Sequence, residues 1–352
     1  MSGFVSGKGR VVTGRRLVAV LAVCAGITAL VALIAPQLGV TMTPNGRSLW
    51  LLGFDAFDAG SPEHKLFMVR LPRVLGAMLV GAALAGAGCT LQALFRNPLA
   101  EPFTLGISSG SSLAAVLAIR FGAEQAFGGA GVAVSALVGA VLTSILIERL
   151  GRVGRQLPPA TLVLAGVTIS MFCSATSMLV QYTSDFSDVS HMLAWMVGGL
   201  ESIRLGGVEY AALPIGACLL LVFAYGRELN ALAAGPDVAA SLGVAVARTQ
   251  IVLFALTAVL VGVAIALAGP IGFVGLVVPH TLRAQLGPDH RVLLPASMFG
   301  GATLLVVCDT LARTLTAPAH LPTGAVTAVL GGPFFMFILI QRKRNAAMWG
   351  RA

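Results

Sequence analysis

Charged side chains are scarce in this chain of 352 residues. Asp, Glu, Lys and Arg make up 11% of the sequence, whereas hydrophobic residues make up 57%. Soluble domains carry about 25% charged residues, so most side chains here must face lipid or the interior of a helix bundle. The low charge content excludes an ordinary soluble domain and predicts a membrane protein.

The chain also lacks the motifs of an enzyme. It contains no GxxxxGK[ST] sequence for binding nucleotide phosphates and no Ser/His/Asp or paired-carboxylate arrangement for catalysis. Its five cysteines are far apart, and no CxxC or Cys/His spacing suggests a metal site. We therefore predict no catalytic residues, no metal and no cofactor, and any energy for work must come from a partner or an ion gradient.

Strand signals are weak, whereas apolar runs near the roughly 20 residues needed to cross a bilayer recur along the whole chain. We predict an all-α polytopic bundle in a single domain over residues 1–352. The ten predicted spans are Leu17–Gln37, Leu71–Leu94, Phe103–Arg120, Phe127–Ile147, Ala160–Gln181, Val208–Gly226, Thr249–Leu267, Ile271–Leu282, Val292–Ala312 and Gly324–Ile340.

The distribution of charge predicts the orientation. With both ends in the cytoplasm, 16 of the 23 Lys and Arg residues fall on the inner side, as the positive-inside rule requires. Residues 1–16 and 341–352 are then cytoplasmic tails. The net charge of +9 reflects this topology, and no basic face with groove-reading elements indicates a nucleic-acid partner.

The segment Gly269–Arg291 is a broken span. Gly269, Pro270, Gly272 and Gly275 crowd its start, and further breaks follow before a charged turn. Irregular backbone at membrane depth is tolerated where protein or a water-filled path covers its polar groups. The segment is either part of a transport pathway or a kinked packing helix.

A capped helix is predicted within residues 229–248. Asp237, after Pro236, is expected to cap its first turn with its carboxylate, and Gly243 is expected to end it in a conformation with positive φ. The middle of the segment is amphipathic and includes Ala240 and Leu242. Pattern alone favours an ordinary loop helix.

Small polar residues line one face of the fifth span. Ser170, Ser174, Ser177 and Gln181 are spaced by four, three and four residues, which places them on one side of a helix. Such residues either line a pathway or hold membrane helices together.

Five blocks of sequence together resemble the FecCD-type permease subunits of iron-chelate and cobalamin ABC importers. They are the stretch from Arg70 to Ser112 with RNPLAEP, then LVLAGV, WMVGGL, LNALAAGPDVAASLGV, and the segment with GFVGLVVPH and GPDHR continuing to LPTGAVTAVLGGPFF. The resemblance covers the chain from about Arg70 to the C-terminus. It implies a type II ABC importer permease with about ten spans, two cytoplasmic ATP-binding subunits per complex, a second permease subunit that is identical or paralogous, and an external binding protein or lipoprotein.

The resemblance also implies roles for particular residues. It makes residues 229–248 the ATPase-coupling segment, with Gly235 among its key positions, and it makes the serine stripe a lining of the pathway. The loop before the fifth span, with Pro158, Pro159 and Ala160, would lie at the inner gate.

Three arginines are implied to dock the external binding protein. Arg70 and Arg73 flank Pro72, a residue suited to a first helical turn, so both are expected at the outer N-terminus of the second span. Cations there cost roughly 0.3–1 kcal/mol each, and an acidic partner or lipid headgroups would explain them. Arg313 follows Asp309 by four residues, which is itself a favourable helical spacing.

These observations predict a permease subunit that carries ferric-siderophore across a bacterial cytoplasmic membrane and is embedded in its lipid bilayer. The alternative cargoes are cobalamin and haem. An ion-coupled secondary carrier is the alternative of another class, but such a carrier usually keeps a carboxylate in mid-span, and here the acids lie near span ends.

Overall fold

The computed structural model describes residues 14–43, 46–53, 57–58, 60–103, 105–123, 126, 129–154, 157–317 and 321–349. Most of residues 1–16 and the last three residues of 341–352 therefore lie outside the described part. Within it, α14 continues through most of the predicted C-terminal tail.

Helices dominate because each predicted apolar run forms one, which confirms the all-α bundle. The long helices are α1 (Gly14–Ile34), α2 (Pro62–Leu94), α5 (Gly129–Gly151), α6 (Pro159–Tyr182), α8 (Leu205–Ala224), α11 (Val246–Ala268), α13 (His290–Thr314) and α14 (Thr323–Trp349). The shorter ones are α3 (Ile107–Arg120), α7 (Phe186–Val197), α9 (Gly226–Ala234), α10 (Pro236–Ser241) and α12 (Val274–Leu286). Among the described residues, seven helices are long and apolar enough to cross a membrane.

The sequence patterns missed a hairpin and two short helices. After α1, a 3-10 turn (Ala35–Gln37) leads into β1 (Leu38–Thr43) and β2 (Gly46–Leu51), which pair antiparallel with Leu38 opposite Leu51. Helices α7 and α9 are too short to give an apolar run of spanning length. The hairpin therefore adds a small two-stranded sheet to an otherwise helical chain.

The start of α2 corrects one prediction. Ser61 caps this helix by accepting a hydrogen bond from the backbone N–H of His64 at 3.0 Å, and Pro62 occupies its first turn. Pro72 is therefore inside α2, and Arg70 and Arg73 are not at its N-terminus. The polar residues after Ser61 hid this earlier start, although Leu66, Phe67, Met68 and Val69 continue the helix.

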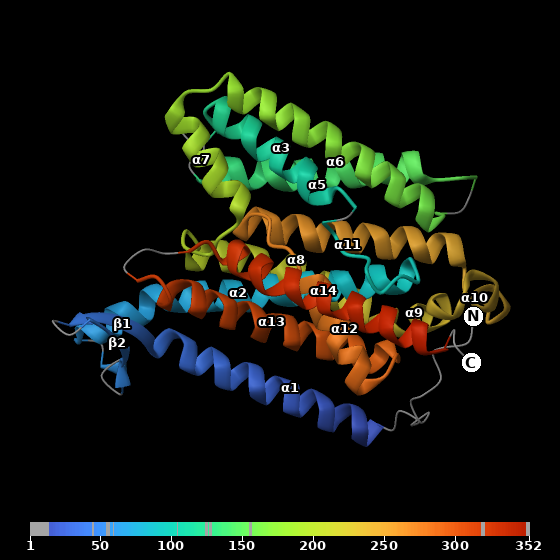
Figure 1. The fold of residues 1–352 in the computed structure, drawn as a ribbon, viewed down its shortest axis with the longest axis horizontal. Coiled ribbons are helices and arrows are strands. Elements are labelled where there is room, and N and C mark those ends of the chain that lie inside the picture. The colour runs from blue at the N-terminus through green and yellow to red at the C-terminus, as the bar shows by residue number, and fades with distance from the viewer. Residues whose placement is uncertain are drawn as a thin grey trace.

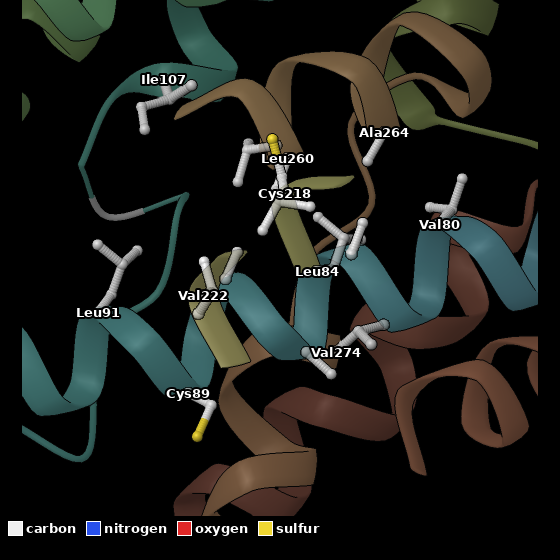
Figure 2. Packing of buried hydrophobic residues seen from close by; sticks show 14 of the residues in the cluster. Val80, Leu84, Cys89, Leu91, Ile107, Cys218, Val222, Leu260, Ala264 and Val274 are labelled. Atoms are coloured by element: carbon white, nitrogen blue, oxygen red, sulfur yellow. The ribbon is translucent and has the colours of Figure 1, made fainter. Parts of the chain in front are cut away.

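Helix α2 forms the centre of the bundle, and α13 packs along it. Gly81 of α2 faces Gly301 of α13 so closely that a Cβ on either glycine would collide with the carbonyl of the other. A Cβ on Gly88 would likewise collide with the carbonyl of Gly275 in α12, and one on Gly275 would meet the carbonyl of Leu84. Small residues let membrane helices approach backbone to backbone. Figure 2 shows the side chains that surround this centre, among them Val80 and Leu84 of α2, Cys218 and Val222 of α8, and Leu260 and Ala264 of α11.

The bundle has two distinct ends (Figure 1). The β1–β2 hairpin marks one, here called the hairpin end. Helix α10 marks the other, called the α10 end, and there α1 begins and α14 finishes. The start of α1 and the end of α14 thus lie at the same end of the bundle, and the orientation of that end in a membrane stays a prediction.

The two halves of the chain repeat one arrangement in opposite directions. Helix α2 starts at the hairpin end and is followed by an irregular segment and the short α3. Helix α11 starts beside α10 and is followed by residues 269–273 and the short α12 (Figure 1). The broken span predicted from Gly269 to Arg291 is therefore confirmed, with Pro279 inside α12.

Candidate functional site

At the hairpin end, a buried ion pair joins α2 to α13. The Nε atom of Arg73 donates to both carboxylate oxygens of Asp309, at 2.8 and 2.9 Å. Thr323 Oγ1 donates to the same carboxylate at 2.9 Å, and Glu201 lies 4.0 Å from the Arg73 guanidinium. Asp309 is only 1% exposed and Arg73 9%. Asp309 thus pairs with Arg73 across two helices, and its predicted favourable spacing to Arg313 is not the contact it makes.

The other two arginines fasten the junction between α1 and the hairpin. Arg70 donates to the carbonyls of Pro36 and Leu38 at 3.1 and 3.0 Å, and Arg313 donates to the carbonyl of Ala35 at 2.6 Å. Arg313 is buried and Arg70 half-buried. The expectation that Arg70 and Arg73 are exposed at a helix start is therefore wrong, because both lie inside α2 and Arg73 is buried. Their role in docking a binding protein stays a prediction.

The ion pair should be costly to break on one side alone. Asp309→Leu leaves the Arg73 guanidinium buried without its carboxylate, and removing one partner of a buried pair costs about 3–5 kcal/mol. Arg73→Met should cost a similar amount. The double variant Arg73→Met/Asp309→Leu should recover most of the loss, because neither charge then remains buried.

Thermal and denaturant unfolding of the four purified proteins in detergent measures this as a double-mutant cycle. Simple additivity of the two single effects would show that the pair contributes no direct interaction.

In the middle of the bundle, the two irregular segments meet. Gln92 Nε2 of α2 donates to the carbonyl of Gly275 at 3.3 Å, and the Glu101 carboxyl accepts from the backbone N–H of Phe273. Phe273, the N-cap residue just before α12, has a φ of 68°, a strained conformation for a residue with a large side chain. Arg96, after α2, has a φ of 49°. Each half thus carries one strained residue at its break.

Glu101 is the titratable group of this junction. It lies between α2 and α3 and is 8% exposed. Its carboxyl accepts the hydrogen bond from the Phe273 backbone, so this buried acid has a polar partner at the start of α12. Glu101 lies in the RNPLAEP sequence, which is part of the family resemblance. No spacing or charge pattern distinguished it from its neighbours, so the sequence analysis did not identify it as a candidate site residue.

The serine stripe of α6 (Ser170, Ser174, Ser177 and Gln181) is only partly exposed. Ser174 is exposed, whereas Ser177 is 3% exposed and Ser170 is half-buried beside Gly106, which precedes α3. Gln181 donates to the sulfur of Met196 at 3.1 Å. The stripe thus combines packing positions with one open position, and helical periodicity could not separate the two.

The predicted gate loop is shorter than expected. Pro158 is the N-cap of α6, so Pro159 and Ala160 already belong to its first turn. Thr161 Oγ1 donates to the carbonyl of Pro158 at 2.9 Å. Proline suits this position because the first helical residues need no N–H donor. Residues 155–156 of the loop lie outside the described residues.

At the α10 end, the predicted coupling helix exists with a different N-cap. Gly235, with a φ of 133°, precedes α10, and no side chain caps that turn. Asp237 is the second residue of the helix and is exposed, so its predicted capping role is wrong.

The C-terminus of α10 follows the prediction. Gly243 has a φ of 82° and donates to the carbonyl of Ala240 at 3.0 Å, while Val244 donates to that of Ala239 at 3.0 Å. This pair of hydrogen bonds is a Schellman motif.

Helix α10 presents apolar side chains to the outside. Ala239 is fully buried, but Val238 is 45% exposed and Leu242 69% exposed. Pro236 and Ala240 are exposed between them. This apolar surface, with the Asp237 carboxylate beside it, has the character of a protein-contact site.

Behind α10, the helix α9 is hydrogen-bonded to the start of α13. Asn230 Nδ2 donates to Asp289 Oδ1 at 2.8 Å, and Asn230 Oδ1 accepts from the backbone N–H of His290 at 2.8 Å. Asp289 also caps α13 by accepting from the N–H of Arg291 at 3.0 Å. The Arg291 side chain holds the pKa of Asp289 down at about 2, so this carboxylate is ionised at neutral pH. Among the described residues, no group of three or more His, Cys, Asp or Glu could hold a metal ion.

Comparison with known proteins matches this architecture. The chain is 40% identical over 284 residues to the hemin transport system permease protein HmuU of Yersinia pestis, covering 80% of this chain and 85% of HmuU. It is 41% identical over 300 residues to the vitamin B12 import system permease protein BtuC of Escherichia coli, covering 84% and 89%.

Among solved structures, one described as an inward-facing metal-chelate type ABC transporter superposes with a TM-score of 0.79 at 30% identity, covering 92% of this chain and 99% of that one. PsaBC from Streptococcus pneumoniae, at 17% identity and a TM-score of 0.52, shares the fold, covering 80% of this chain and 92% of that chain. The FecCD transport family profile matches residues 50–341. The chain therefore belongs to the FecCD transport family, as a multi-pass membrane permease of the ABC importer type.

Proposed function

We propose that this chain is the permease subunit that carries a ferric siderophore inward across a bacterial cytoplasmic membrane. Two cytoplasmic ATP-binding subunits, a second permease subunit and an external binding protein would complete the importer. The observation that carries the proposal is the exposed apolar α10 at the end where α1 begins and α14 finishes. With no nucleotide motif in the sequence, the chain needs such a surface to receive work from a partner.

The orientation is part of the proposal. Lys and Arg residues gather on the side of the two termini, which the positive-inside rule assigns to the cytoplasm. The α10 end would then face the ATPase, and the hairpin end would face the binding protein.

Other metal chelates are alternative cargoes. The names of HmuU and BtuC refer to hemin and vitamin B12, so haem and cobalamin are the second candidates.

Liposomes containing this chain with its ATPase and binding protein should accumulate an iron-55-labelled ferric hydroxamate when supplied with ATP. Labelled haemin and cyanocobalamin, tested in parallel, decide the cargo. An ATPase with its catalytic residue removed should abolish uptake, whereas persistent uptake would indicate an ion-coupled carrier.

The coupling role of α10 gives a second expected outcome. Asp237→Lys reverses a charge on the exposed surface without touching a hydrogen bond or a cap, so the protein should insert and fold normally. ATP-driven uptake should fall at least tenfold, and the ATPase should bind this variant more weakly. Asp185→Lys, the same reversal at an exposed position before α7, is the matched control. Transport-coupled ATP hydrolysis at the normal rate in Asp237→Lys would refute the role of α10.

We further propose that the open part of the α6 stripe lines the pathway. Ser174→Leu should then reduce uptake severalfold, while ATPase assembly and thermal stability stay unchanged, because bulk is added to an exposed position. Thr168→Leu makes an equivalent change at an exposed position about 120° around the helix. Equal uptake by the two variants would mean that Ser174 lies outside the pathway.

We also propose that the binding protein docks at the hairpin end, and that Arg70, Arg73 and Arg313 contribute to this docking. Because Arg73 and Arg313 are buried, they would act by holding the shape of this end, with half-buried Arg70 nearest to a partner's carboxylates. The Arg73→Met/Asp309→Leu double variant keeps the packing and removes the internal charges. Binding-protein affinity measured on that variant separates shape from charge.

A further inference from the structure

The hydrogen bonds of Asn230 tie the segment that carries α10 to a helix that runs through the bundle. Asn230 lies on α9, which is separated from α10 by Gly235 alone. Its partners, Asp289 and His290, lie 59 and 60 residues further along the chain. The contact is therefore a tertiary one between the coupling segment and α13.

The contact uses both ends of the Asn230 amide. Nδ2 donates to Asp289 Oδ1, while Oδ1 faces both the backbone N–H and the ring Nδ1 of His290, each at 2.8 Å. The backbone N–H of His290 can only donate, which fixes the oxygen of the amide on that side. The same oxygen then requires a proton on Nδ1 of the His290 ring. Reversing the amide would place donors against donors, so the arrangement has a single orientation.

The surroundings make this contact stiff. His290 is 3% exposed, and its Nε2 has no hydrogen-bond partner among the described residues. A Cβ added at Gly226, the first residue of α9, would lie 3.4 Å from Cγ of Arg291. Asn230 and Asp289 are themselves half-buried, so these directional hydrogen bonds are partly shielded from solvent and resist sliding of one helix over the other.

Helix α13 leads from this contact to the other end of the protein. It packs along α2 and against α12, and it carries the Asp309 carboxylate that pairs with Arg73 at the hairpin end. Displacement of α10 would thus reach α13 through α9 and Asn230, as well as through the covalent connection to α8 and α11.

We propose that Asn230 is a positioning residue that transmits movement of the ATPase-docking segment to α13, by bridging Asp289 and His290. This role rests on the proposed function of α10. Asn230 contacts neither ATPase nor cargo in this assignment, and it acts through the direction of its hydrogen bonds.

The direction of the bridge can be reversed in a test. Asn230→Asp places two carboxylates at positions 230 and 289, where the native donor and acceptor are 2.8 Å apart, so they should repel. Asp289→Asn keeps an oxygen for the N–H of Arg291 and for the Asn230 amide, but its NH2 group replaces the oxygen that accepts from the Arg291 guanidinium, so this variant loses that exposed ion pair. In the double variant Asn230→Asp/Asp289→Asn, the amide NH2 at 289 donates to the carboxylate at 230, and the oxygen at 230 still accepts from His290. The amide oxygen at 289 then faces the Arg291 guanidinium, while the backbone N–H of Arg291 loses its acceptor.

The readout is the nucleotide-driven change at the hairpin end, measured without cargo. Nitroxide labels at Phe121 and Leu315, both exposed, would be introduced into a variant of this chain whose own cysteines are replaced. Pulsed electron paramagnetic resonance then compares the complex with its ATPase in the nucleotide-free and ATP–vanadate states. ATP hydrolysis and thermal stability are recorded on the same samples.

We expect Asn230→Asp to reduce the ATP-dependent change in label distance at least fivefold, while ATPase binding is retained. Asp289→Asn should stay within twofold of the native protein, and the double variant should recover to within twofold. An unaltered change in Asn230→Asp overturns the proposal. So does a double variant that folds and binds ATPase but fails to recover, since the reversed bridge would then not restore transmission. If the native chain binds no ATPase, the proposed function itself fails, which is a separate outcome.

Discussion

Close backbone packing around α2 is the constraint on which the rest of this structure depends. Of its most apolar stretch, 78% is buried inside the protein, against 6% for α1 and 22% for α6. In a bilayer there is little hydrophobic force between helices, so association depends on packing and hydrogen bonds. The glycine contacts of α2 with α12 and α13 supply this packing. Because they bring carbonyl oxygens close to opposing glycines, a larger residue would have to displace the facing backbone, and these three helices form one closely packed unit.

Charged and amide groups that are buried or half-buried occur both within this unit and where it is joined to its neighbours. Arg73 and Asp309 join α2 to α13 at the hairpin end, and Asn230 joins α9 to α13 at the α10 end. Glu101 touches the start of α12 in the middle. A buried pair such as Arg73–Asp309 contributes little net stability compared with apolar packing, but it is costly to misalign. These groups therefore specify how the helices register with one another rather than how strongly they associate.

The sequence predicted the helices well because bilayer thickness sets a length that apolar runs must meet. It failed where local pattern and tertiary environment disagree. Pro72 looked like a helix start, yet Ser61 and Pro62 begin α2 earlier, and the polar residues between gave no sign of it. Aspartate is a common helix-capping residue, but in α10 the N-cap position is Gly235. Asp237 is the second residue of the helix, and its side chain is exposed. Periodicity placed Ser174 and Ser177 on one face, but only contact with the remaining helices decides which of them is buried.

Sequence could name Arg73, Asp309 and Asp289 as charged residues near span ends, but it could not show which groups they bind, because their partners lie on other helices. Asn230 gave no signal, since an asparagine in a short inner helix fits many roles.

The grouping of the helices also indicates which parts of the protein move relative to one another. Helix α6 packs against α3 and α5, and α7 lies beside α3 and α6, so these four helices form a group apart from the unit of α2, α12 and α13 (Figure 1). Packed cores move as blocks rather than deforming continuously. Movement during transport should therefore occur between these two groups, with α11 between them and with α9 and α10 driving the group that contains α13.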